Sequence, residues 1–280
     1  MEALCTEYKI YNPQRQIYTP VDSQLLLSYK ESESGQILEE GISEAGAMSS
    51  FTAAGMAYST VGKPTIPFYI YYSMFGFQRV GDQIWCAADS RTKGFLLGAT
   101  AGRTTLNGEG LQHQDGHSIL TSSTVPNCLT YDAAFAYEIG IIVKEGLRRM
   151  YENNEDIFYY LTLYNENYQM PAIPKNCKEG ILKGIYKFKG SSNAQVRLIG
   201  SGPIMVQVLK AEKILNNLGI NCDVWSATSF GGLRREAIEC ERWNRLNPRK
   251  KTTIPYITKV MNNEEITTVA ATDHMKAVPD

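Results

Sequence analysis

The sequence predicts an α/β fold built on a mainly parallel, buried β-sheet. Short runs rich in β-branched and aromatic residues alternate along the chain with longer segments whose apolar residues recur at helical spacing. With 280 residues, 43% hydrophobic and 20% charged, the chain can bury a substantial core and has the composition of an ordinary globular protein. One large domain or two smaller ones are therefore expected.

Six segments have the length and composition of buried strands, and they are 67–72, 94–99, 127–131, 157–164, 196–200 and 222–228. Small and apolar residues at three- and four-residue spacing predict helices between them, over 37–58, 77–91, 133–151 and 203–218. Because strands and helices alternate, the strands are expected to run parallel, with helices crossing from one to the next.

The composition changes at residues 170–195, "MPAIPKNCKEGILKGIYKFKGSSNAQ", a stretch rich in Pro, Lys, Gly and Ser. Such a stretch is typical of a linker. A new strand–helix–strand pattern begins after it, from "VRLIGSG" to "NCDVWSATS". We therefore expect a domain boundary near residue 190, with a first domain over 1–190 and a second over 191–280.

Charge and cysteine content exclude several classes of function. A net charge of −1 predicts no electrostatic attraction to nucleic acid or to an anionic membrane. The most apolar tract, 65–77, falls short of the roughly 20 residues that span a bilayer, and the first residues do not form a secretory signal. The six cysteines include no C-x-x-C pair, so no zinc knuckle or redox pair is expected. These features predict a cytoplasmic protein.

The loop "NGEGLQHQDGHS" (107–118) concentrates ionisable groups. It contains two of the three histidines, His113 and His117, together with Glu109 and Asp115, among glycines that permit tight turns. The residues alone leave two interpretations open. The histidines are solvated or structurally hydrogen-bonded, or the loop brings a proton donor and a proton acceptor to a catalytic pocket.

Two motifs fall short of known ligand-binding patterns. In "HQDGH" (113–117), Gln114 replaces the general-base glutamate of the H-E-x-x-H zinc motif, and no metal site is expected. In "IGSGPIM" (199–205), Met205 takes the place of the third glycine of a dinucleotide fingerprint. The glycines of the second motif are better explained by a tight strand-to-helix turn.

Glu44 and an aromatic run each admit a structural and a functional interpretation. Glu44 precedes small and apolar residues, so it is either a solvated helix carboxylate or a carboxylate that faces a closed apolar site. The run "FYIYYSMFGF" (68–77) either packs in the core and at an interface or offers a stacking surface for a flat heterocycle.

Several stretches together resemble the homodimeric-type bacterial pyruvate dehydrogenase, the thiamine-diphosphate-dependent first component of the pyruvate dehydrogenase complex. They are "QILEEGISEAGAMSSFTAAGMAYS" (36–59), the block 66–118, "YNENYQMPAIP" (164–174) and "ECERWNRLNP" (239–248). The resemblance runs over essentially the whole chain. It implies a transketolase-like α/β fold, in which a parallel-sheet pyrimidine-binding middle domain is followed by part of a second, C-terminal α/β domain.

The resemblance implies a set of cofactor-binding residues. Glu44 matches the glutamate that hydrogen bonds to the pyrimidine ring and thereby promotes loss of the thiazolium C2 proton. Tyr72 and Phe75 match aromatic residues that line and stack on the pyrimidine, and Ile42 matches an apolar neighbour of the same ring.

The resemblance also gives the 107–118 loop a catalytic role. His113 matches the histidine that faces substrate, and Glu109 matches the acid that accompanies it. His117 is expected to orient the loop. An acid is common in the family at the position of Gln114, so the local negative charge is lower here.

The implied reaction is decarboxylation of pyruvate on thiamine diphosphate, with transfer of the acetyl unit to the lipoyl group of a partner acyltransferase. The family's G-D-G motif for the diphosphate and Mg²⁺ is not found, since Gly81-Asp82 continues with "QIW". We therefore expect a fragment or split subunit that carries only the pyrimidine half-site. Mg²⁺ would be bound by the missing N-terminal domain or subunit, and the chain would work in a homodimer. The open alternatives are another 2-oxo acid dehydrogenase, a transketolase-like enzyme, or a non-catalytic dimerisation fragment.

Overall fold

The computed structural model of the chain describes residues 2–23, 25, 29–106, 108–191, 193–261 and 266–280. They divide into two compact units, Met1–Ala47 and Met48–Asp280. The first unit contains helix α1 (Glu2–Tyr8) and a short parallel pair, β1 (Ile10–Tyr11) and β2 (Glu31–Ser32). The fold of the second unit follows from its two four-stranded sheets.

Helix α2 (Glu44–Gly55) begins later than the sequence pattern predicts. The hydroxyl oxygen of Ser43 accepts a hydrogen bond from the backbone N–H of Gly46 at 3.3 Å, which caps the first turn. Gly41 has a φ of +66°, which no continuous helix allows. The helix predicted over 37–58 is therefore wrong for residues 37–43, and its end is taken by a separate short helix, α3 (Ala57–Thr60).

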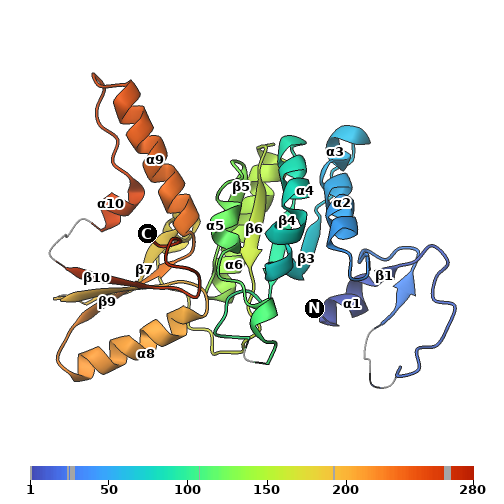
Figure 1. Ribbon diagram of the computed structural model, residues 1–280, viewed down its shortest axis with the longest axis horizontal. Helices are drawn as coiled ribbons and strands as arrows, with labels where there is room; N and C mark the ends of the chain where they lie inside the picture. Colours follow the sequence, from blue (N-terminus) through green and yellow to red (C-terminus); the bar gives the residue numbers. More distant parts are fainter. Residues whose placement is uncertain (1, 24, 26–28, 107, 192, 262–265) are drawn as a thin grey trace. The chain divides into compact units, whose positions relative to one another are not determined.

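The first sheet has four parallel strands in the order β3-β4-β6-β5 (Figure 1). Each strand lies inside a predicted one, and they are β3 (Phe68–Tyr72), β4 (Phe95–Ala99), β5 (Cys128–Tyr131) and β6 (Phe158–Thr162). The parallel α/β fold is thus confirmed.

Both faces of this sheet are covered, because successive strand residues point to opposite sides. Leu96 and Tyr160 pack in one core with Met48 and Phe51 of α2. Phe95 and the neighbouring strands' aromatic residues pack in a second core on the other face. The helices concerned are α4 (Phe77–Asp89) and α5 (Ser118–Ser122) on the first face, and α6 (Ala136–Leu147), the π-helical turn η3 (Arg148–Glu152) and α7 (Lys178–Lys183) on the second.

The second sheet has the order β10-β8-β9-β7, in which only the pairing of β7 with β9 is antiparallel among the described strands. Its strands are β7 (Ile185–Lys189), β8 (Val196–Gly200), β9 (Cys222–Ala227) and β10 (Thr267–Ala271). Helix α8 (Ile204–Asn217) packs on one face, and α9 (Phe230–Leu246) and α10 (Tyr256–Val260) pack on the other (Figure 1).

The linker predicted over 170–195 is wrong for a large part of its length. Residues 178–183 form α7, and residues 185–189 form β7, which bonds to β9 as an edge strand. The boundary near residue 190 stays a prediction, although β7 belongs to the second sheet. No helix within the described ranges is both long enough and apolar enough to cross a membrane.

Candidate active site

The candidate site lies at the carboxyl edge of the first sheet, where ligands bind in open parallel sheets. Tyr72 is the last residue of β3, and Phe75 follows in the 3-10 turn η1 (Ser73–Phe75). His113 belongs to the 3-10 turn η2 (Leu111–His113), in the long connection that leaves β4. Because β3 and β4 are parallel neighbours, their carboxyl ends bring these segments to the same edge.

Three of the residues singled out in the sequence are in contact here. The imidazole of His113 lies 5.1 Å from the ring of Tyr72 and 5.4 Å from the ring of Phe75, measured between centroids. The rings of Tyr72 and Phe75 are themselves 6.0 Å apart. Tyr72 keeps 44% of its surface exposed, so the aromatic pair retains a face that a flat ligand ring can contact.

The histidine is held in one tautomer by the backbone. His113 Nδ1 lies 3.0 Å from the carbonyl oxygen of Glu109. Since a carbonyl oxygen only accepts, we infer that Nδ1 carries a proton and that Nε2 is the nitrogen directed away from the Glu109 backbone. Among the described residues no hydrogen bond to Nε2 is found, so this nitrogen is available to take a proton from a ligand and return it.

Buried Asp115 anchors the C-terminal end of the loop. One carboxylate oxygen accepts from the Ser73 hydroxyl at 2.6 Å, and the other from the backbone N–H groups of His117 and Ser118 at 3.0 and 2.9 Å. Burial alone would raise the pKa of Asp115, but these hydrogen bonds together lower it. The carboxylate therefore stays ionised and ties the loop to η1.

His117 also makes contacts at the C-terminal end of the loop. Its imidazole Nε2 contacts Nε2 of Gln78 on α4, and Nδ1 lies 3.8 Å from the Asp115 carboxylate. These contacts are directed at the loop's own support, whereas His113 faces the aromatic pair. Its expected orienting role stays a prediction.

A buried charged cluster follows the carboxyl ends of β5, β6 and β10. His274 Nε2 lies 3.6 Å from Asp132 Oδ2, and both side chains are almost fully buried. Tyr164 donates to Asp132 Oδ1 and lies 3.2 Å from His274 Nε2. The hydroxyl of Thr162 also donates to Asp132 Oδ1, at 2.7 Å.

The two charges of this cluster stabilise each other. Burial would raise the pKa of Asp132, but the positive charge of His274 and the hydrogen bonds lower it. Burial would likewise lower the pKa of His274, but contact with ionised Asp132 outweighs burial and raises it. Both shifts therefore favour the ion-paired form of Asp132 and His274.

Neither Asp132 nor His274 has a role predicted from the sequence. For Asp132 a usable signal was present, because it directly follows the mostly buried strand β5. His274 follows β10, whose exposed residues do not predict a strand. Carboxyl ends of parallel strands are where functional side chains gather. The spatial pairing of residues so far apart in the chain has no sequence signature.

Two predicted residues, Ile42 and Glu44, belong to the first compact unit. Ile42 is 99% exposed, and Glu44 is the first residue of α2. Their grouping with the aromatic pair stays a prediction. Glu109 joins His113 through its backbone carbonyl, and the role of its carboxylate also stays a prediction.

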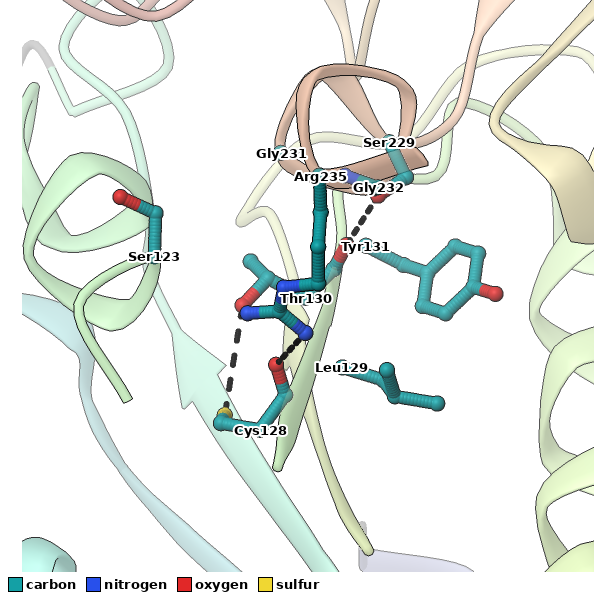
Figure 2. A pocket seen from close by; sticks show the side chains of 9 residues that line it. All are labelled: Ser123, Cys128, Leu129, Thr130, Tyr131, Ser229, Gly231, Gly232 and Arg235. Atoms are coloured by element: carbon teal, nitrogen blue, oxygen red, sulfur yellow. Dashed lines mark hydrogen bonds between the residues drawn. The ribbon is translucent and has the colours of Figure 1, made fainter. Parts of the chain in front are cut away.

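A separate pocket lies where the N-terminus of α9 meets β5 (Figure 2). Arg235 crosses it and donates to the carbonyl oxygens of Cys128 and Val125, both at 3.2 Å. Ser229 donates to the carbonyl of Thr130 at 2.6 Å. These donors join α9 to the first sheet, so the pocket's polar groups already have structural partners. Within the described residues no group of three or more His, Cys, Asp or Glu is arranged to hold a metal ion.

Two family models match the chain. Residues 1–171 match the pyruvate dehydrogenase E1 component middle domain, and residues 184–280 match the transketolase-like C-terminal domain. The pyruvate dehydrogenase E1 component of Pseudomonas aeruginosa is 53% identical over 280 residues, which is 99% of this chain and 32% of that protein. The corresponding protein of Escherichia coli K12 is also 53% identical, over 99% of this chain and 31% of its own length.

Solved structures agree on the fold. The transketolase from Leishmania mexicana superposes with a TM-score of 0.66 at 16% identity, over 88% of this chain and 32% of that one. At this identity the likeness concerns the fold alone. The chain spans about a third of the length of the curated relatives it matches.

Proposed function

This chain belongs to the pyruvate dehydrogenase E1 component family, and we propose that it supplies the pyrimidine-binding half of a thiamine-diphosphate-dependent active site. The single observation that carries the proposal is the contact of His113 with Tyr72 and Phe75 at the carboxyl edge of the first sheet. A proton-transferring group beside a partly exposed aromatic pair is what a flat, nitrogen-containing heterocycle needs.

The residues present fit the aminopyrimidine ring. Tyr72 and Phe75 offer ring faces for stacking, and the guanidinium of Arg79 lies 3.9 Å from the centroid of the Phe75 ring on α4's side. Ile42 would contribute apolar contact. Glu44 would hold a proton against a pyrimidine ring nitrogen, which a carboxylic acid can donate and recover.

When bound, thiamine diphosphate supplies an electron sink for loss of CO₂ from a 2-oxo acid. The chain's own residues orient the reactants and move protons around that centre. His113, whose Nδ1 lies against the Glu109 carbonyl, would present Nε2 to the substrate. Glu109 would accompany it as a second acid–base group. Buried Asp115 and the turn η1 keep the loop and the aromatic pair in register.

We propose pyruvate as the substrate and the lipoyl group of a partner acyltransferase as the acetyl acceptor, in a cytoplasmic homodimer. The diphosphate and Mg²⁺ would be bound by a part of the active site that this chain does not contain. Family membership and extensive identity to proteins named pyruvate dehydrogenase E1 component support this assignment.

The test is a complementation assay. The chain is mixed with a second polypeptide that covers the remaining part of the Pseudomonas aeruginosa relative, together with thiamine diphosphate, Mg²⁺ and free lipoamide. CO₂ release from carboxyl-labelled pyruvate is measured for the mixture and for each component alone. We expect CO₂ release from the mixture only, because metal and phosphate contacts provide much of the cofactor's binding energy.

Matched variants assign the activity to the proposed half-site. Phe75→Ala should weaken cofactor binding in the mixture, whereas Glu33→Gln, an exposed carboxylate paired with Arg15, should leave it unchanged. Faster turnover of 2-oxobutyrate than of pyruvate would reassign the substrate. CO₂ release by the chain alone, or a mixture inactive although it binds the cofactor, would contradict the proposal.

A further inference from the structure

The residues that follow β10 run from the second sheet to the connection between β4 and α5, residues 100–117, which we call the His113 loop. After β10 the chain continues as a segment that we call the strap, residues 272–278. Val278 at its end packs against the core on one face of the first sheet. The strap therefore links the two sheets of the second compact unit directly.

Asp273 of the strap binds the N-terminal end of the loop, at Arg103 and Thr104. Its Oδ2 accepts from the backbone N–H groups of Arg103 and Thr104, at 2.7 and 3.0 Å, and from the Thr104 hydroxyl at 3.0 Å. The carboxylate is almost fully buried, although both loop residues are exposed. A single ionised oxygen thus collects three donors, and charge-assisted hydrogen bonds of this kind are about twice as strong as neutral ones.

The backbone of the strap completes the grip. The Arg103 guanidinium donates to the carbonyl oxygens of Asp273 and His274, at 2.9 and 3.2 Å. At the C-terminal end of the loop, the N–H of Met275 donates to the carbonyl of Gly116 at 2.7 Å. The strap therefore contacts the loop on both sides of His113.

The sequence of the loop is adapted to this contact. Gly102 has a φ of +79°, and a Cβ at this position would lie 2.3 Å from Asp273 Oδ2. The Gly102 carbonyl accepts from the N–H of Asp115 at 2.9 Å, which closes the loop at its base. Glycine is thus required for the approach of the carboxylate and for the closure of the loop.

We propose that Asp273 is a positioning residue, through which the second domain holds the His113 loop in the geometry that presents Nε2. The proposal rests on the function proposed above, because it concerns how that same site is kept in order. Asp273 does not approach the aromatic pair itself. Its effect passes through the two ends of the loop, at Arg103–Thr104 and at Gly116.

The first readout is hydrogen–deuterium exchange of the 280-residue chain. The amides of Glu109, His113 and Asp115 donate to carbonyl groups within the loop and not to the strap. Faster exchange at these amides would therefore show that loss of the Asp273 contacts loosens the loop itself. In Asp273→Ala they should exchange about ten- to a hundredfold faster, which corresponds to loss of hydrogen bonds to a charged group. Asp273→Asn keeps one acceptor oxygen and should give an intermediate increase.

The matched control is Asp280→Asn. This carboxylate is exposed, lies beyond the strap and pairs with Lys276 at 3.5 Å. Exchange of the loop amides should be the same as in the unaltered chain. Amides of β6 should keep their protection from exchange in every variant. If Asp273→Ala does not fold, exchange of the loop amides is measured in Asp273→Asn instead.

The second readout is the imidazole nitrogen spectrum of His113, which is assigned with single-histidine variants because the chain has only three histidines. The unaltered chain should show the tautomer protonated on Nδ1, and Asp273→Ala should show averaging between the two tautomers. Neither readout needs cofactor, so the result is independent of whether the proposed function is correct. Unchanged loop exchange with an unchanged tautomer, or equal acceleration in the loop and in β6, would overturn the proposal.

Discussion

Replacing His274 by glutamine should lower the stability of the chain in a pH-dependent manner. His274 and Asp132 form a buried ion pair at 3.6 Å, and removing one partner of a buried pair costs about 3–5 kcal/mol. The carboxylate keeps two donors on Oδ1, from Thr162 and Tyr164, and glutamine can still donate a hydrogen bond. We therefore expect the lower end, about 3 kcal/mol.

The sign of the pH dependence follows from the two pKa shifts. The pKa of His274 is raised in the folded state, so its contribution is fully present below the unfolded pKa of about 6.5 and is lost as pH rises through the folded pKa. The pKa of Asp132 is lowered, so its contribution is present above about 3.9 and is lost as pH falls further. The stability difference between the unaltered chain and the variant should be largest between about pH 4 and pH 6.5.

Urea unfolding at a series of pH values measures this difference. With an m value of about 3 kcal/mol/M, the midpoint of the variant should fall by about 1 M at pH 6 and by less at pH 9. His117→Gln is the matched control. Its imidazole is 38% exposed and lies 3.8 Å from Asp115, so its loss should cost under about 1 kcal/mol. A difference for His274→Gln that stays constant from pH 5 to pH 9 would show that the pair is not charged.

Three further results are expected. In the complemented enzyme, Glu44→Gln should slow H/D exchange at thiazolium C2 by about a hundred- to ten-thousand-fold, because glutamine cannot exchange the proton, and an unchanged exchange rate would remove Glu44 from this role. His113→Ala should spare that exchange but depress steady-state turnover far more than His117→Ala does, and equal small losses for the two would make both histidines structural. Burial raises the pKa of the Cys128 thiol to about 12, so iodoacetamide at pH 8 should modify exposed Cys86 and not Cys128. Peptide mass spectrometry would identify the modified cysteine. Rapid labelling of Cys128 in the folded protein would contradict its burial.

The strands of the first sheet could be predicted because a sheet covered on both faces leaves a continuous apolar run in the sequence. β6 is the clearest case, since all five of its residues are buried. β10 and β7 were missed for the opposite reason. β10, "TTVAA", is exposed over most of its length, and β7, "IYKFK", carries two lysines, so neither forms such a run.

Two of the helical discrepancies also have local causes. Helix α9 was not predicted because only Leu233 of its seventeen residues is buried, which leaves little apolar periodicity to detect. The early start predicted for α2 extended an apolar pattern through Gly41 and past the cap at Ser43. Capping and positive φ decide where a helix begins, and both outweigh a hydrophobic pattern.

The candidate site was only partly predictable. The resemblance singled out Tyr72, Phe75 and His113, and the structure places them in contact, although their roles stay proposals. The contacts of Asp273 with Arg103 join residues 170 positions apart. Such a contact depends on how the second sheet packs against the first, which neither periodicity nor motif spacing encodes.

The strand order β3-β4-β6-β5 constrains how the chain can reach its native state. β5 is synthesised before β6, yet its bonded neighbour in the sheet is β6, which inserts between β5 and β4. Until residue 162 has left the ribosome, β4 and β5 both have unpaired edges that can join other chains. Parallel pairing at this separation is slow because loop-closure entropy is lost before the contacts form. The central strand should therefore set the folding rate, and aggregation during synthesis should be greatest in chains arrested between β5 and β6.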